Sequence, residues 1–374
     1  MEYKRLGDIA TYINGYPFKP EDRGLTGLPI IRIQDLTGNS YDLGFYNGNY
    51  PERIEINDGD VLISWSASLG VYIWNKGKAL LNQHIFKVAF DKCDVNREFF
   101  VYAVRHKLKE MESKTHGATM KHIVKKDFDN TLIPFPTLNE QGKIAKLLDT
   151  AATIISARQQ QLQKLDELVK ARFVEMFGDM VHNPNNWKKV NLGSVCDVRD
   201  GTHDSPKYFS EGYPLVTSKN VTSGRIDFAD CSLICKEDYN KINERSKVDF
   251  GDILMPMIGT VGKPVIVDVD ADFAIKNVAL IKFYENSKVI NIFVRALLQS
   301  DYFDCVVISK IRGGTQKFIS LSDIRKLEIC LPPMDTQNEF AAFVEQTDKL
   351  EVAVQKALDE AQLLFDSLMQ KYFQ

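Results

Sequence analysis

The 374-residue sequence lacks an excess of positive charge, a membrane segment and an export signal. Its 47 Lys and Arg are balanced by 50 Asp and Glu, for a net charge of -3. This excludes a polycation that coats nucleic acid, because such binding depends on clustered basic residues that neutralise phosphates. No stretch approaches the roughly 18 apolar residues of a membrane span, and the N-terminus has no basic segment followed by an apolar run. We therefore expect a cytoplasmic protein.

Cysteine and histidine are scarce and poorly spaced for a metal site. Among the six cysteines only Cys231 and Cys235 are close in sequence, and no second pair stands at zinc spacing. This pattern favours reduced thiols in the core over disulfides or a zinc site. The six histidines include no helical pair with a carboxylate partner, so we expect no bound metal.

The sequence also lacks recognisable catalytic motifs. Residues 259–264 resemble a phosphate loop, but the first glycine is misplaced and Pro264 stands where a magnesium-binding hydroxyl belongs. Residues 183–187 match only half of an adenine methyltransferase motif, and no Gly-rich loop follows an N-terminal strand to hold a methyl donor. We expect a turn between domains there. Three acidic residues, Asp58, Asp60 and Asp252, lie in turns, where Asp commonly bonds the local backbone.

What the sequence does contain is an internal repeat. Four stretches of the first half recur, in order, in the second: 5–15 as 191–201, 58–70 as 250–262, 117–127 as 313–323, and 136–141 as 332–337. The shift between the copies grows slowly from 186 to 196 residues, as small loop insertions in the second copy would produce. The length suits two domains, so we infer that a similar domain is present twice.

Each copy ends in a stretch that is typical of a long helix. Apolar residues recur at steps of three and four, with Arg158 and Arg172 filling the two gaps: Leu148, Ala151, Ile155, Leu162, Leu165, Val169 and Met176. A second series, with Thr347 among its positions, runs through Phe343, Leu350, Val354, Ala357, Ala361, Leu364 and Leu368. Such spacing predicts a coiled-coil seam, although for one such helix alone packing on its own domain would be the favoured interpretation.

Before each long helix the sequence predicts a mixed domain. Short β-rich runs are expected at 28–33, 60–65, 71–74 and 85–90, and at 214–217, 252–255, 264–269 and 278–284. Apolar helical stretches follow at 98–111 and 292–308. The expected fold is therefore α+β, with two repeated globular domains separated by a pair of long antiparallel coiled-coil helices in a pseudo-twofold arrangement. The boundaries are a first globular domain at 1–137, a central helix at 138–180, a second globular domain at 181–333 and a C-terminal helix at 334–374.

Four phrases of the sequence resemble the DNA-specificity subunits of Type I restriction-modification systems. They are residues 133–141, 330–337, 176–179 and 200–208. The first of these leads into the first long helix, and the second is its repeat in the second half of the chain. The likeness covers essentially the whole chain, and its strength lies in the ordered repetition. One departure is that Gln337 follows Thr336, whereas Gln141 follows Glu140.

The resemblance implies a non-catalytic subunit of a methyltransferase and endonuclease complex. Each of the two globular domains would be a target recognition domain that binds one half of a bipartite site in double-stranded DNA. The paired helices would set the spacing and dock two methyltransferase subunits near Glu140, Gln141 and Gln337. Motor-nuclease subunits would join for cleavage, and S-adenosylmethionine and ATP would belong to those partners, leaving this chain without a cofactor. The alternative is a stand-alone DNA-modifying enzyme, a methyltransferase or nuclease, with an unrecognised site.

Candidate DNA contacts are polar residues in Gly-rich loops, because base edges are read by Arg, Lys, Asn and Gln while small hydroxyls bind phosphates. Residues 105–126 carry seven Lys or Arg, and residues 305–322 carry three basic residues and no acidic one. In the first domain we select Lys114, His116, Thr119 and Lys121, followed by Asn82 and Gln83. In the second domain the candidates are Arg312, Thr315, Gln316 and Lys317, followed by Thr202, His203, Lys219 and Asn277.

Overall fold

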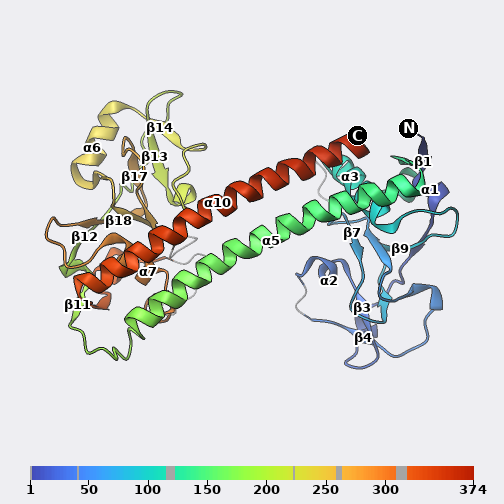
Figure 1. The fold of residues 1–374 in the computed structure, drawn as a ribbon, viewed down its shortest axis with the longest axis horizontal. Helices are drawn as coiled ribbons and strands as arrows, with labels where there is room; N and C mark the ends of the chain where they lie inside the picture. Colours follow the sequence, from blue (N-terminus) through green and yellow to red (C-terminus); the bar gives the residue numbers. More distant parts are fainter. Residues whose placement is uncertain (1, 40–41, 115–122, 222–223, 258–262, 309–317) are drawn as a thin grey trace. The chain divides into compact units, whose positions relative to one another are not determined.

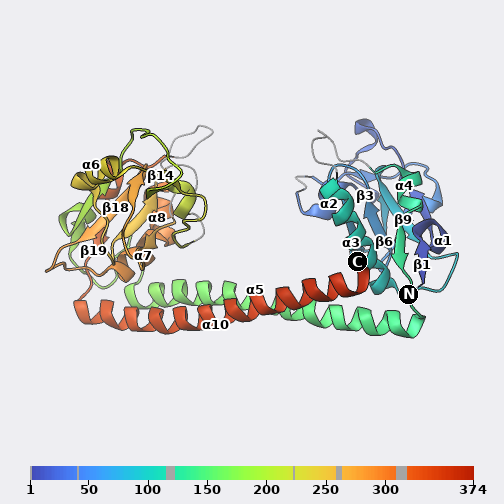
Figure 2. The same cartoon turned by 90° about the horizontal axis from the view of Figure 1, so that it is seen from above.

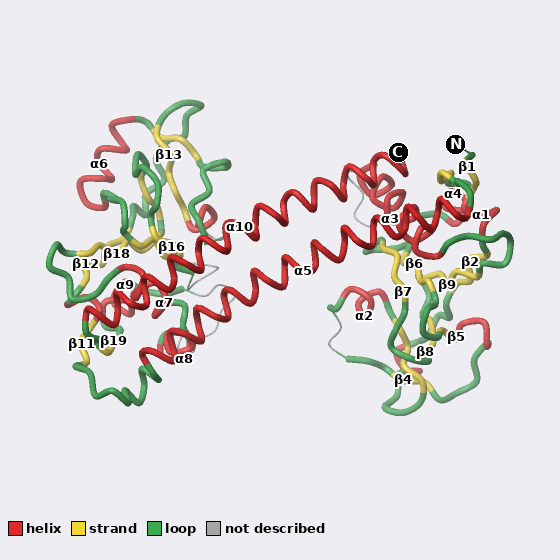
Figure 3. Tube along the Cα trace, viewed as in Figure 1, coloured by secondary structure: helices red, strands yellow, loops and turns green. Residues whose placement is uncertain are grey.

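The computed structural model describes residues 2–39, 42–114, 123–221, 224–257, 263–308 and 318–374, except for the side chains of residues 113 and 114. These residues form two compact units (Figure 1). Unit 1 comprises Met1–Gln159 and Lys356–Gln374, and unit 2 comprises Gln160–Gln355. Outside the two long helices, the chain is a mixture of short strands, short helices and loops (Figure 3).

Unit 1 contains two four-stranded sheets and a separate strand pair. The pair joins β1 (Tyr3–Arg5) to β10 (Leu132–Pro134). The first sheet has the order β2 (Thr11–Asn14), β9 (Ile85–Ala89), β6 (Val61–Ser64) and β7 (Gly70–Ile73), all antiparallel. The second has the order β4 (Phe45–Tyr46), β3 (Leu28–Ile31), β8 (Ala79–Leu81) and β5 (Glu55–Ile56), with β3 and β8 parallel. The helices are α1 (Leu6–Ile9), α2 (Ile33–Thr37), α3 (Arg97–Lys114) and α4 (Lys125–Asp129), with 3-10 turns at Pro20–Asp22 and Glu52–Ile54.

Unit 2 repeats this plan. The strand pair joins β11 (Lys189–Asn191) to β19 (Glu328–Cys330). One sheet has the order β12 (Cys196–Asp200), β18 (Val278–Phe283), β15 (Ile253–Pro256) and β16 (Val265–Ile266). The other has the order β14 (Ser232–Ile234), β13 (Tyr213–Thr217) and β17 (Ala274–Lys276), with β13 and β17 parallel as β3 and β8 are in unit 1. The helices are α6 (Lys236–Ser246), α7 (Asn291–Leu298), α8 (Asp301–Val306) and α9 (Leu321–Arg325), with 3-10 turns η3 (Leu192–Ser194) and η4 (Ser218–Val221). The strands of each unit can be followed in Figure 2.

The repeated acidic turns have the structural role that the sequence indicates. Asp60 accepts a hydrogen bond from the Asn57 amide at 2.8 Å, and Asp252 accepts one from the Asp249 amide at 2.7 Å. Each turn contains a glycine with positive φ, Gly59 in unit 1 and Gly251 in unit 2, a conformation that glycine adopts without the steric cost of a side chain. The turns start the buried central strands β6 and β15.

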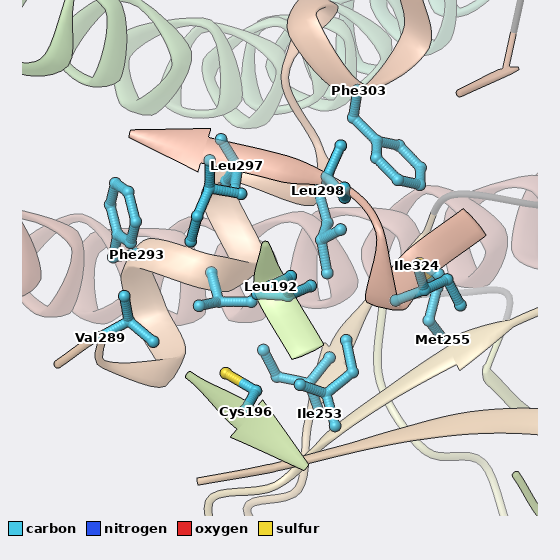
Figure 4. Close-up of a cluster of buried hydrophobic side chains, with 14 of the residues drawn as sticks. Leu192, Cys196, Ile253, Met255, Val289, Phe293, Leu297, Leu298, Phe303 and Ile324 are labelled. Atoms are coloured by element: carbon cyan, nitrogen blue, oxygen red, sulfur yellow. The ribbon is translucent and has the colours of Figure 1, made fainter. Parts of the chain in front are cut away.

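The hydrophobic cores confirm the duplication at the level of packing. In unit 1 the Phe373 ring lies 5.3 Å from that of Phe99, and in unit 2 the Phe177 ring lies 4.9 Å from that of Phe293. Both pairs join the end of a long helix to the helix that follows the sheet. The core of unit 2 also contains Leu192, Cys196, Ile253 and Leu297, which belong to one buried cluster with Phe293 (Figure 4).

The two long helices are α5 (Leu138–Phe177) and α10 (Met334–Phe373), each of 40 residues. Within unit 2 they run antiparallel, because Arg172 bonds Glu339 near one end while Asp166 lies near Glu351 further along. Desolvation and, after it, the negative charge of Asp166 raise the pKa of Glu351. Each unit thus contains the start of one long helix and the end of the other.

The predicted seam of the second helix is wrong at two positions. Leu350 and Leu364 are 57% and 54% exposed, whereas Phe365 and Leu368 pack against the core of unit 1. The adjacent residues Leu364 and Phe365 both lie three or four positions after Ala361, so spacing alone did not identify Phe365 as the one that packs.

Two predicted elements are shorter in the structure than in the sequence interpretation. The helical stretch at 292–308 is divided into α7 and α8 at Ser300, whose hydroxyl donates to the Leu297 carbonyl at 2.6 Å. Ser commonly bonds local backbone in this way and so competes with helix continuation. The predicted strand at 28–33 ends at Ile31, and α2 follows because the Asp35 carboxylate accepts from the Arg32 amide at 2.8 Å.

Candidate nucleic-acid interface

A polar turn occupies the same place in both units. In unit 1 it joins β8 to β9 and lies beside the segment after β2, where Gln83 donates its backbone N–H to Tyr16 O at 2.9 Å. In unit 2 it joins β17 to β18, where Asn277 donates its backbone N–H to Thr202 O at 3.2 Å. We call these two sites the paired turns. Their matching hydrogen bonds identify Gln83 and Asn277 as structural counterparts.

A glycine in each unit permits this close approach. A Cβ on Gly15 would lie 2.0 Å from Asn82 O, and a Cβ on Gly201 would lie 2.2 Å from Ile275 O. Both distances are far below van der Waals contact, and the opposing atoms are backbone carbonyls that cannot rotate away. The glycines at equal spacing in the repeat are therefore required for the paired turns to form.

The structure brings the described candidates of unit 1 to this turn. Asn82 and Gln83 are adjacent within it, and Asn82 Oδ1 accepts from the Gln83 amide at 2.7 Å. The next residue, His84, has φ of 73° and its ring packs edge-on against Trp65, 5.0 Å between centroids. Non-glycine residues with positive φ are uncommon and concentrate at turns and functional sites.

The described candidates of unit 2 also lie together. His203 contacts Asn277 Oδ1 at 2.7 Å through Nδ1 and the buried Asp200 Oδ2 at 2.8 Å through Nε2. Thr202 is hydrogen-bonded to the Asn277 backbone, as described above. Ser218, next to Lys219 in η4, donates its hydroxyl to Asn277 O at 3.2 Å. Four candidates from three separate segments therefore surround one turn.

The remaining DNA-contact candidates cannot be placed. His116, Thr119, Lys121, Arg312, Thr315, Gln316 and Lys317 lie outside the described residues, and only the backbone of Lys114 is described. Ile123 and Ile319, which follow the two undescribed segments, are anchored in matching ways. Ile123 donates its amide to Trp65 O at 3.0 Å, and Ile319 donates its amide to Met257 O at 2.9 Å. Trp65 in turn donates its amide to His84 O at 3.2 Å, beside the turn of unit 1.

The sequence interpretation missed Gln34. The parallel pairs Ile31 with Leu81 and Val216 with Ile275 place Gln34 and Lys219 at equivalent positions, three residues after Ile31 and Val216 respectively. Both side chains are exposed. A signal was present, because residues 29–36 align with 214–221 at a shift of 185.

Two of the predicted docking residues, Gln141 and Gln337, hold a structural place in the fold. Gln141 and Gln337 are both fully buried. Gln141 accepts from the Asn96 amide and donates to Pro136 O, both at 2.9 Å. Gln337 accepts from the Ile290 amide at 3.0 Å and donates to Lys288 O and Pro332 O at 2.9 and 3.0 Å. Neither side chain is free for direct contact with a partner, and both instead hold the start of a long helix to its domain.

Glu140 lies on the surface, where it caps its own helix. Its carboxylate accepts from the Thr137 amide at 3.0 Å and from the Thr137 hydroxyl at 2.7 Å. These hydrogen bonds from Thr137 lower the pKa of Glu140. This capping box explains the Thr-Leu-Asn-Glu phrase without a partner.

The described residues offer no clear chemical site. They contain no group of three or more His, Cys, Asp or Glu that could hold a metal ion. Burial raises the pKa of Cys196 to about 12, as expected of an unreactive core thiol. None of the helices in the described part of the chain is long and apolar enough to cross a membrane.

Comparison with known proteins gives the same domain twice. The Type I restriction modification DNA specificity domain matches residues 1–167 and again residues 184–361. The Type I restriction enzyme EcoBI specificity subunit of Escherichia coli is 25% identical, over 98% of this chain and 84% of the relative. The MjaVIII specificity subunit of Methanocaldococcus jannaschii is 26% identical, over 93% and 86%.

Solved structures share the fold. The Type-I restriction-modification S subunit from M. genitalium superposes with a TM-score of 0.59 at 15% identity, covering 100% of this chain and 96% of that one. A chain from a study of complex assembly in the type I R-M system gives a TM-score of 0.57 at 19% identity, covering 99% and 97%. The two domain matches span most of the sequence, and the chain therefore belongs to the Type I restriction-modification DNA specificity family.

Proposed function

We propose that this chain is the DNA specificity subunit of a Type I restriction-modification complex and that each paired turn contributes to reading one half of a bipartite site. The observation that carries the proposal is the duplication of the turn, with Gln83 and Asn277 at matching positions on matching hydrogen bonds. Side-chain amides read base edges by hydrogen bonds. Two such sites in one chain suit two separate half-sites.

The chemistry around the turns suits DNA recognition better than catalysis. Lys219 and its counterpart Gln34 stand beside the turns and are exposed, as expected of groups that contact phosphates or base edges. With a net charge of -3, phosphate binding has to be local or shared with partner subunits. Because its ligand is DNA, we assign the protein to the cytoplasm.

We further propose that the long helices dock the methyltransferase subunits and set the distance between the half-sites. Large apolar side chains stand exposed along both helices: Leu147, Ile154, Leu168 and Val174 on α5, and Leu350, Val352, Leu363 and Leu364 on α10. Exposed apolar surface on a soluble protein commonly marks an interface. Since each unit carries the start of one helix and the end of the other, two equivalent docking surfaces and two methyltransferase subunits follow.

In this proposal the chain performs no chemistry itself. Methyl transfer from S-adenosylmethionine belongs to the methyltransferase subunits, and ATP-driven cleavage belongs to motor-nuclease subunits when these are present. The alternative of a stand-alone DNA-modifying enzyme predicts methylation or cleavage by the chain alone. Incubation of the purified chain with DNA and S-adenosylmethionine or magnesium separates the two ideas.

The main test is to map the DNA site of the chain with its methyltransferase partner. Sequencing of methylated bases should return two short half-sites with an unread spacer. Gln83→Ala should relax one half-site and Asn277→Ala the other, while Gln163→Ala, an exposed control on α5, should leave both intact. A single continuous site, or one variant that relaxes both halves equally, would contradict two independent recognition sites.

A further inference from the structure

The side-chain amide of Asn277 is held by a histidine that has no counterpart in unit 1. His203 Nδ1 lies 2.7 Å from Asn277 Oδ1. The backbone of Asn277 is fixed as well, by its amide bond to Thr202 O and by the Ser218 hydroxyl on its carbonyl. With the backbone fixed, rotation of the side-chain amide determines whether Asn277 turns its amide oxygen or its amide nitrogen outward. In unit 1 the position of His203 in the repeat is taken by Pro17 and that of Asp200 by Asn14.

Both ring nitrogens of His203 face oxygen acceptors. Nε2 lies 2.8 Å from Asp200 Oδ2, and Asp200 is only 7% exposed. A carboxylate and an amide oxygen each require an N–H on the ring, and only the doubly protonated imidazolium carries both. With the amide oxygen of Asn277 toward Nδ1, the arrangement is one that only the charged histidine satisfies.

Loss of one proton changes the arrangement in a defined way. The neutral ring keeps its N–H on Nε2, because the Asp200 carboxylate can only accept there. Nδ1 then becomes an acceptor and is satisfied only if Asn277 turns its amide so that Nδ2–H donates to it. The turn of the amide moves Oδ1 to where Nδ2 was, so the outward group changes from a donor to an acceptor.

The charged groups around this histidine come from several elements. Asp200 lies on β12, and its second carboxylate oxygen contacts the guanidinium of Arg245 from α6. Asp204 follows His203 in the same loop, where its backbone N–H donates to the Thr202 hydroxyl at 3.1 Å. Lys276 from β17 donates from its ammonium group to the Ser205 hydroxyl at 2.6 Å. Among these groups Asp200 contacts the ring directly, Arg245 contacts Asp200, and the His203 side chain is 61% exposed.

We propose that His203 is a positioning residue whose protonation state decides whether Asn277 offers a hydrogen-bond donor or an acceptor to the second half-site. This rests on the proposed DNA recognition by unit 2. The protonated state favours an acceptor on the base edge, such as guanine N7 or O6, and the neutral state favours a donor, such as the amino group of adenine or cytosine. In unit 1 the neighbouring His84 packs its ring against Trp65 and makes no hydrogen bond to the Gln83 side chain among the described residues, so the first half-site serves as the internal control.

The test is a binding survey with the chain and its methyltransferase partner on duplexes that carry every single base-pair change in each half-site. Binding is compared at about pH 6 and about pH 8, on either side of the usual histidine range. We expect the preferred base pair at one position of the second half-site to change, with relative affinities shifting by about tenfold. The first half-site should keep the same preferences at both pH values.

Two variants separate positioning from a merely structural role. His203→Gln cannot become charged, so its preferences in the second half-site should be the same at both pH values. Asn277→Asp keeps a residue that tolerates positive φ but carries only acceptors, so the preference for an acceptor on the base should be lost at the lower pH. A wild-type pattern in the second half-site that does not change with pH would overturn the proposal.

A measurement on the free chain distinguishes failure of this inference from failure of the proposed function. With asparagine and histidine labelled by nitrogen-15, the side-chain amide signal of Asn277 should move in step with the titration of His203, and it should stay fixed in His203→Gln. If the amide responds but the complex protects no half-site, the DNA proposal is wrong and the local device stands. An Asn277 amide signal that does not change with the protonation of His203 would overturn the proposed coupling, whether or not DNA binds.

Discussion

The buried glutamines that begin the long helices allow a quantitative test of the structure. Gln337→Met keeps the side-chain volume close to that of glutamine but removes three hydrogen bonds, those to Ile290 N, Lys288 O and Pro332 O. A hydrogen bond contributes about 1 kcal/mol net, and a buried polar group left unpaired costs about 1 to 3 kcal/mol. The free energy of unfolding of unit 2 should therefore fall by about 3 kcal/mol.

The repeat supplies a graded comparison. Gln141→Met removes two hydrogen bonds, from Asn96 N and to Pro136 O, so unit 1 should lose about 2 kcal/mol. The control is Gln163→Met, because Gln163 is exposed and bonds only Glu167 at 2.8 Å. A surface change of this kind should stay within about 0.5 kcal/mol.

Urea unfolding followed by tryptophan fluorescence can assign each loss to a unit. Trp65 and Trp74 report on unit 1 and Trp187 on unit 2, and replacement of the tryptophans of one unit by phenylalanine isolates the other signal. A loss of about 3 kcal/mol should lower the midpoint by about 1 M or more. If Gln337→Met changes the midpoint no more than Gln163→Met does, then the buried hydrogen bonds of Gln337 do not hold the start of the helix to its domain.

Other substitutions probe the turn, the helix, the core and an ion pair. Gly201→Ala should destabilise unit 2 by several kcal/mol, roughly 3 or more, because its Cβ would lie 2.2 Å from a backbone carbonyl; circular dichroism melting with the second half-site affinity checks this. Gly142→Ala meets no atom within 4 Å in α5 and should stabilise by up to about 1 kcal/mol in the same melts. Phe373→Ala should cost unit 1 about 3 to 5 kcal/mol in urea, since the ring is fully buried. Hydrogen bonds from Lys78 and then Tyr50 lower the pKa of Glu55, so this stabilisation is complete above the ordinary glutamate pKa and is lost as the pH falls through the folded value; Lys78→Met should flatten the acid limb of the stability curve, and an unchanged limb would contradict this.

The repeat and the long helices could be predicted from the sequence because both are regular patterns. The glycines at matching spacing, Gly15 and Gly201, have no other explanation than a repeated close approach, and the structure contains it. The apolar series of the first helix indicated its long course correctly. In the second helix Leu350 and Leu364 misled the seam assignment, because spacing does not state which of two adjacent apolar faces meets the core.

The candidate interface was only partly predictable, because its residues come together through tertiary pairing. Strands β8 and β17 have three residues each, too few for a periodic signal, yet their parallel pairing with β3 and β13 creates the paired turns. Gln34 was missed for this reason, although the repeat aligns it with Lys219. The burial of Gln141 and Gln337 could not be predicted either, since glutamine is usually exposed and three of the five hydrogen-bond partners lie 45 to 49 positions away.

The central claim is that two units read separate half-sites whose spacing is set by the long helices. It is tested most directly by inserting two helical turns, about seven residues, near Gln160 in α5 and a matched segment near Lys356 in α10, where the chain passes from one unit to the other. The added helix length is about 10 Å at 1.5 Å per residue, equal to about three base pairs. Sequencing of methylated bases from cells that express the variant with its methyltransferase partner should return both original half-sites with a spacer about three base pairs longer. An unchanged spacer, or the loss of either half-site sequence, would contradict the claim.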